Sequence, residues 1–117
     1  MAIISSHTLN GIDGTHAGGI SVELKNIKTN KYLFKTFMDN EGRLNEIVSP
    51  ELIDENAIYE LVFGVGKYWK KVHVISDKNK VLNEIVIRFK IIDRYKKYHM
   101  PIILSPNSYS TWWSDGE

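Results

Sequence analysis

The 117-residue chain contains no cysteine. This excludes a disulfide framework, a thiolate zinc site and a cysteine nucleophile. The chain also lacks a charge bias, because 15 Lys and Arg stand against 14 Asp and Glu and leave a net charge of +1. Such a balance gives no electrostatic reason to expect a nucleic-acid partner. Any catalysis has to use His, Ser, Thr, Tyr, Arg or carboxylate side chains.

Long apolar runs are missing too. The longest, MPIILSP at 100–106, contains proline and is far shorter than the ~20 residues that cross a bilayer. We therefore expect no membrane partner. The start, MAIISSHTLNG, has only four apolar residues before its first serine and no basic residue among them, so we expect no signal peptide and a cytoplasmic location.

The sequence instead shows apolar and polar residues alternating in strand-length segments, a pattern typical of an all-β sandwich or barrel. In the first such segment Ile20, Val22 and Leu24 share one face. The turn DNEG then brings Arg43 to the start of a short strand. The segments predicted as strands are 20–27, 31–38, a short one after the turn at 39–42, 58–65, 83–92, 98–104 and 109–113, with 58–65 and 83–92 as the central pair.

The segment 66–75 departs from this alternation. Tyr68, Trp69, Val72 and His73 are spaced as on one or two helical turns, although a bent strand fits almost as well. The glycine-rich stretch 11–19 lacks the Gly-Lys-Ser/Thr ending of a phosphate loop and is predicted to be a flexible loop leading into the first strand. We expect a single domain, 1–117, of seven or eight strands with at most one short helix.

Four histidines are the obvious titratable candidates, because histidine alone has an ordinary pKa near neutrality. They are His7, His16, His73 and His99. None forms an H-x-H, H-x-x-H or H-E-x-x-H pattern, so we expect no metal site. Taken singly, each is expected to be a surface or hydrogen-bonded side chain.

Four pieces of the sequence, in this order, resemble one family. They are SSHTLNG at 5–11, TFMDNEGR at 36–43, YHMPIILSP at 98–106 and YSTWW at 109–113. Together they are similar to the 5-hydroxyisourate hydrolases, the transthyretin-like enzymes of purine catabolism. The resemblance covers nearly the whole chain. It implies an all-β, transthyretin-like (prealbumin-like) sandwich of two sheets with one short helix, and a homotetramer with active sites between subunits.

The resemblance also implies a catalytic set. The family's two histidines and arginine correspond to His7, His99 and Arg43. In the implied reaction, ring opening of a urate-derived small molecule without a cofactor, one histidine acts as general base. The second orients water or returns the proton, and the arginine holds the developing negative charge. Which histidine is the base is left open.

The chain departs from the family at its carboxyl end. The family ends in Tyr-Arg-Gly-Ser, where this chain has Trp112, Trp113, Ser114 and Asp115. Strand alternation predicts that the two tryptophans face opposite sides, and the register with the family implies that Trp113 is the one in the site. We expect Trp113, Ser114 and Thr111 to bind substrate. An indole in place of a guanidinium favours a flatter or more apolar molecule.

A milder departure is Asn10, where the family usually has aspartate. Loss of that carboxylate predicts a less basic His7. Three functions stay open: a 5-hydroxyisourate hydrolase, a family-derived enzyme that hydrolyses or cyclises a more apolar substrate, and a non-catalytic binder of an apolar ligand.

Overall fold

The computed structural model describes residues 1–72 and 79–115. The elements in chain order are β1 (Ala2–Asn10), β2 (Ser21–Asn26), β3 (Lys31–Phe37), β4 (Arg43–Val48), the 3-10 helix η1 (Pro50–Leu52), β5 (Tyr59–Gly64), α1 (Val65–Val72), β6 (Ile85–Phe89), β7 (Lys97–His99), β8 (Ile102–Ser105) and β9 (Ser108–Thr111).

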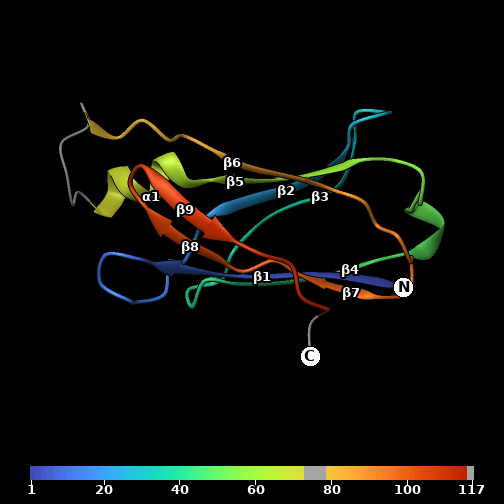
Figure 1. The fold of residues 1–117 in the computed structure, drawn as a ribbon, viewed down its shortest axis with the longest axis horizontal. Helices are drawn as coiled ribbons and strands as arrows, with labels where there is room; N and C mark the ends of the chain where they lie inside the picture. Colours follow the sequence, from blue (N-terminus) through green and yellow to red (C-terminus); the bar gives the residue numbers. More distant parts are fainter. Residues whose placement is uncertain (73–78, 116–117) are drawn as a thin grey trace.

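The strands form two sheets that lie face to face (Figure 1). One sheet has the order β3-β2-β5-β6. The other has the order β4-β1-β8-β9, with β7 also pairing β1. Helix α1 lies at one end of the sandwich, near the turn between β8 and β9 (Figure 1). The two-sheet sandwich with one short α-helix is therefore confirmed.

The core lies between the sheets and follows the alternation of the sequence. In β2 and β5 every second residue is buried, including Leu24, Leu61 and Phe63. Helix α1 turns Trp69 into the same core, where 1% of its surface remains exposed. The helix predicted for 66–75 is thus confirmed up to Val72, while His73 lies outside the described residues.

Strand β1 was not predicted, and the reason lies in its inward side chains. Ser6, Thr8 and Asn10 face the core, so the segment lacks a simple apolar face. Their polar groups are satisfied: Ser6 Oγ donates to the Met100 carbonyl at 2.7 Å, and Thr8 Oγ1 donates to the Ala17 carbonyl at 2.6 Å. A buried polar group that is hydrogen-bonded costs little.

Three other expectations were wrong in detail. Strand β6 is an edge strand in the described chain, because it pairs only β5. The segment 98–104 forms two strands, since Pro101 has no N–H for the sheet ladder. In β3 alternation predicts Tyr32 and Phe34 on one face and Leu33 on the other, but a bulge opposite Leu24 breaks it, so that Tyr32 is exposed and both Leu33 and Phe34 pack on the core.

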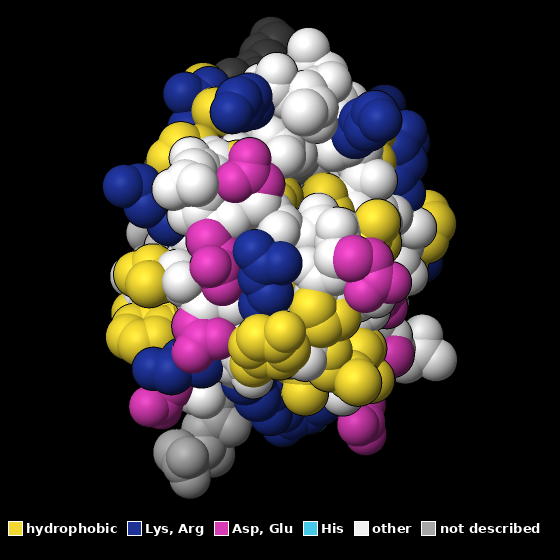
Figure 2. Space-filling view, turned by 90° about the vertical axis from the view of Figure 1, so that its right-hand side faces the viewer, with side chains coloured by type: hydrophobic (Ala, Val, Ile, Leu, Met, Phe, Trp, Pro, Cys, Tyr) yellow, Lys and Arg dark blue, Asp and Glu magenta, His cyan; other side chains and the backbone are white. Residues whose placement is uncertain are grey.

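The sandwich surface mixes charges of both signs. Figure 2 shows the end opposite α1, where Lys and Arg lie among Asp and Glu around hydrophobic patches. No helix among residues 1–72 and 79–115 is long and apolar enough to cross a membrane.

Candidate active site

His7 and Arg43 lie side by side on the outer face of one sheet. They are paired across β1 and β4, and His7 points outward because its neighbours Ser6 and Thr8 face the core. A tight turn brings Arg43 to this position. The Asp39 carboxylate accepts the backbone N–H groups of Glu41 and Arg43, both at 2.9 Å.

His99 joins this face from β7. It is paired with Ser5 of β1, two residues before His7 and therefore on the same side of the strand. The Ser5 hydroxyl and His99 Nδ1 are 2.8 Å apart and hydrogen-bonded. Three segments distant in sequence thus place His7, Arg43 and His99, hereafter the His-Arg-His trio, on one face.

The trio affects its own protonation. Burial lowers the pKa of His7, and the positive charges of Arg43 and His16 lower it further, while a hydrogen bond that His7 donates to the Glu41 backbone and the negative charge of Asp39 raise it. Burial likewise lowers the pKa of His99, with contributions from Lys97, His7 and Arg43. Both imidazoles are therefore kept neutral near pH 7 and can accept a proton.

These lowered pKa values predict how stability depends on pH. An unfolded histidine has a pKa of about 6.5. Below this value and down to the lower folded pKa, the unfolded chain binds more protons than the folded one, so the free energy of unfolding falls as pH falls. Urea unfolding at a series of pH values measures this. The decline should be shallower in a His7→Asn, His99→Asn double variant, and stability that rises on acidification through this window would contradict the prediction.

His16 is a member of this face that sequence reasoning missed. Its Nδ1 lies 3.1 Å from His7 Nε2, in hydrogen-bonding range, and the ring centroids are 5.2 Å apart. The loop 11–19 folds back on β1, since Asn10 N–H donates to the Thr15 carbonyl and Ala17 N–H donates to that of Thr8. The predicted flexible loop is therefore attached to the strand that carries His7.

Asn10 does not act on His7. It lies on the opposite face of β1, 2% exposed, where its amide donates to the Tyr68 hydroxyl at 3.0 Å. Its side-chain oxygen accepts the backbone N–H of Ile12 at 2.8 Å. The expectation that Asn10 lowers the basicity of His7 was wrong, because every second residue of a strand faces away.

The carboxyl tail reaches the trio through Ser114. The backbones of Ser114 and His99 exchange two hydrogen bonds of 3.0 and 2.9 Å. Paired residues in a ladder project to the same side, so Ser114 lies beside the His99 ring. Of the three residues expected to bind substrate, Ser114 is the one that the structure brings next to a histidine of the trio.

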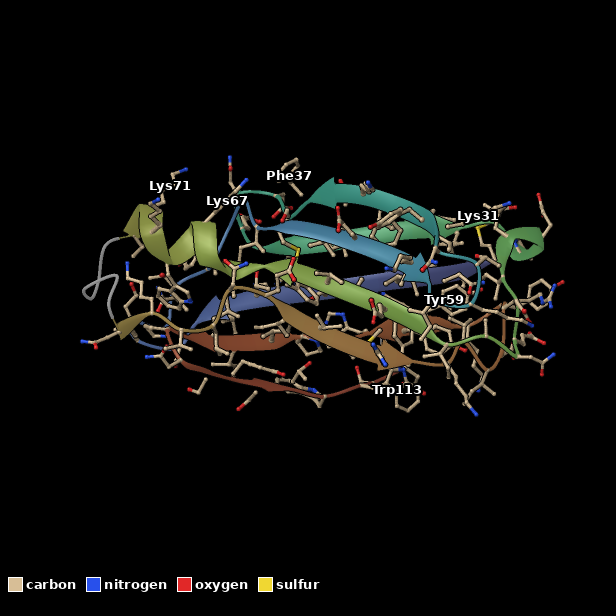
Figure 3. All side chains as sticks on the ribbon, turned by 90° about the horizontal axis from the view of Figure 1, so that it is seen from above. Lys31, Phe37, Tyr59, Lys67, Lys71 and Trp113 are labelled. Atoms are coloured by element: carbon tan, nitrogen blue, oxygen red, sulfur yellow. The ribbon has the colours of Figure 1, made fainter. Side chains whose placement is uncertain are left out.

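The tryptophans lie elsewhere. Trp112, Trp113 and Thr111 all line a cavity of about 330 Å³ at the edge formed by β6, with Phe89 and Tyr98 among its other walls. Trp113 packs on the inward-facing Tyr98 at 6.4 Å between ring centroids. Figure 3 shows Trp113 at this edge. Strand β9 ends at Thr111, so the strand alternation from which opposite orientations were predicted does not reach the two tryptophans.

The described part of the chain shows no cluster of three or more His, Asp or Glu that could hold a metal ion. The trio and Ser114 offer two neutral imidazoles, a guanidinium and a serine hydroxyl. This combination can activate water, stabilise an oxyanion and return a proton.

Known proteins share both sequence and fold with this chain. The model of the HIUase/Transthyretin family matches residues 4–113. The probable 5-hydroxyisourate hydrolase of Caenorhabditis elegans is 36% identical over 114 residues, which are 95% of this chain and 80% of that protein. The 5-hydroxyisourate hydrolase of Ralstonia nicotianae is 31% identical, over 96% of this chain and 97% of that protein.

Solved structures are similar at lower identity, which bears on the fold alone. The Klebsiella pneumoniae 5-hydroxyisourate hydrolase superposes with a TM-score of 0.78 at 23% identity, over 97% of this chain and 99% of that one. Sea bream transthyretin in complex with thyroxine gives 0.81 at 16% identity, over 97% and 96%. An (S)-allantoin synthase gives 0.82 at 21% identity, and this chain spans 43% of its length. The chain belongs to the HIUase/Transthyretin family.

Proposed function

We propose that this chain catalyses the hydrolytic ring opening of 5-hydroxyisourate or a closely related urate-derived heterocycle. The observation that carries the proposal is the convergence of His7, Arg43 and His99 on one outer face. Relatives about 30% identical over nearly their whole length are named 5-hydroxyisourate hydrolases, which supports the same chemistry here. The reaction needs an activated water, a stabilised oxyanion and a proton for the leaving nitrogen.

The hydrogen bonds favour His99 as the general base. Its Nδ1 is engaged by Ser5, and if Nδ1 carries the hydrogen and donates it, Nε2 is bare and can take a proton from water. The Nε2 of His7 already faces His16. We therefore assign proton return or water orientation to His7, and oxyanion stabilisation to the Arg43 guanidinium.

The test uses 5-hydroxyisourate generated in place by urate oxidase, with its decay followed spectroscopically with and without the chain. We expect clear acceleration that is proportional to protein concentration. An unchanged decay rate would eliminate the hydrolase.

A second candidate is a family-derived enzyme acting on a more apolar ring with the same trio. The observation that favours it is the replacement of the family's terminal Tyr-Arg-Gly-Ser by Trp112, Trp113, Ser114 and Asp115. Three results together would establish this second candidate. The chain would leave 5-hydroxyisourate decay unchanged, it would turn over a less polar cyclic amide, and His99→Asn would abolish that turnover.

The tail predicts a measurable effect at Ser114. A Ser114→Pro variant lacks the N–H that donates to the His99 carbonyl, whereas Ser114→Ala keeps it. Because one such bond contributes ~0.5–1.5 kcal/mol, we expect Ser114→Pro to lower kcat/KM about 2- to 10-fold relative to Ser114→Ala in the decay assay. Equal activities of the two variants would show that the tail does not position His99.

We also propose that four chains assemble with this face between subunits. Apolar side chains flank the trio on the same face: Ile47, 63% exposed and paired with Ile3, and Ile103, 39% exposed. They lie toward the two ends of this face, opposite Ile3 and Leu9 of β1, and exposed apolar surface on a sheet is common where another chain packs. A stable monomer in size-exclusion chromatography would count against this assembly.

A further inference from the structure

The His7–His16 contact joins the trio to a residue that the proposed mechanism does not use. His7 Nε2 and His16 Nδ1 face each other at 3.1 Å, and the rings are tilted by 37°. Two backbone contacts fix the segment around His16 against β1. Leu9 and His16 form an isolated ladder pair, and Ala17 N–H donates to the Thr8 carbonyl. His16 is therefore placed by backbone pairing, independently of its ring.

A hydrogen bond between two imidazole nitrogens requires one hydrogen on the line that joins them. With one hydrogen there, one nitrogen donates and the other accepts. If both rings were cationic, both facing nitrogens would carry hydrogen and the contact would become repulsive. The pair can therefore take up one proton with its bond intact, but a second proton only by breaking it.

We propose that His16 is a positioning residue of this site, sharing one proton with His7 so that the two rings carry at most one positive charge between them near neutral pH. This inference rests on the proposed function for its role in turnover. With a hydrogen of His7 donated to the Glu41 backbone and Nε2 facing His16, Nε2 of His7 accepts from His16 Nδ1. A proton accepted at Nε2 of His16 moves the bridging hydrogen from His16 Nδ1 to His7 Nε2, so that the pair carries one positive charge, on His7. The reverse transfer returns both rings to neutrality.

The surrounding charges favour one charge over two. Arg43 lies beside His7 in the ladder, and its positive charge opposes a charge on His7. Asp39 and the Glu41 backbone favour a charge on His7 and make the first proton acceptable. Two cationic imidazoles beside a guanidinium would have only the Asp39 carboxylate among these groups to offset them.

The experiment is an NMR titration of the histidine ring signals in the full chain, assigned with His7→Asn and His16→Asn variants. Coupled groups titrate in macroscopic steps that belong to the pair. We expect the His7 signal to follow two steps separated by about one pH unit or more, and a single step in both His16→Asn and His16→Ala. The asparagine variant keeps an amide near Nε2 of His7 but cannot titrate, whereas the alanine variant removes the side chain. Comparing the two variants therefore separates the loss of proton sharing from the loss of packing.

A matched control changes the loop without changing any imidazole. Asp13→Asn weakens the turn in which Asp13 accepts from Thr15, and the two steps of His7 should persist. In the decay assay we expect His16→Asn and His16→Ala to lower kcat about tenfold, the effect of losing one hydrogen bond to His7, with KM unchanged.

The outcomes separate this inference from the proposed function. A single His7 step in the unaltered chain, with the same midpoint in His16→Ala, would overturn proton sharing. Unaltered kcat in both His16 variants would overturn the role of His16 in turnover. Two steps in a chain that does not accelerate 5-hydroxyisourate decay would uphold proton sharing while eliminating the hydrolase.

Discussion

Replacing His99 with asparagine is expected to lower kcat/KM for 5-hydroxyisourate by about 10²–10⁴-fold, the usual contribution of one acid-base group. His7→Asn is expected to have a loss within the same range. The physical reason is that asparagine keeps hydrogen-bonding capacity but cannot take up a proton near pH 7. The initial rate of decay, corrected for the spontaneous reaction, measures both effects.

The backbone pairing of His99 and a control variant at Ser5 allow the loss of activity to be separated from unfolding. His99 is held by backbone pairing to Ser5 and Ser114, which the substitution leaves in place, so unfolding curves should stay close to those of the unaltered chain. Ser5→Ala is the graded control: it removes the partner of Nδ1 but leaves the imidazole, and should cost about tenfold or less. A fully active His7→Asn, His99→Asn double variant would refute the assignment.

Substituting Gly42 with alanine is expected to lower the free energy of unfolding by about 3 kcal/mol, from left-handed strain and overpacking together. Gly42 has φ of 72°, which L side chains rarely adopt. A Cβ there would also lie 2.5 Å from the Thr8 carbonyl oxygen and 2.9 Å from that of Ala17. Both are backbone atoms with little freedom to move. Urea unfolding measures the change.

Gly14 provides the matched control. Its φ is 78°, but a Cβ there meets nothing within 4 Å, so Gly14→Ala carries the strain alone, about 1–2 kcal/mol. Gly42→Ala also has a functional readout. Because Gly42 precedes Arg43, displacing the turn at Gly42 should lower kcat/KM as well. Equal losses of stability in the two variants would mean that the close approach to β1 does not constrain the turn.

The parts of the fold that sequence could predict are those where one face is apolar and the other polar. Strands β2 and β5 follow this rule, because their inward residues Val22, Leu24, Leu61 and Phe63 are all apolar and buried in the core. Strand β1 does not follow it. Its inward serine, threonine and asparagine make bonds to segments far away in sequence, and no local pattern reports such bonds.

The site, like the fold, has a part that the sequence could predict and a part that it could not. Family resemblance located the three residues of the trio, and ladder register explains why they share a face. Ser114 was expected at the site, but its backbone pairing with His99 and the His7–His16 contact were not predictable, because each depends on how an irregular segment returns to a strand. The tryptophans were misplaced for a related reason: β9 is only four residues long, so its period does not govern the residues beyond Thr111.

The uneven burial of the three tryptophans has an optical consequence. Trp69 is 1% exposed, and its indole nitrogen has no hydrogen-bond partner among the described residues, whereas Trp112 and Trp113 are 50% and 57% exposed. An indole in a dry, apolar surrounding emits at shorter wavelength than one in contact with water. The core and the tail of this protein therefore emit in separable bands, and Trp112 and Trp113 form an intrinsic fluorophore at the cavity beside β6.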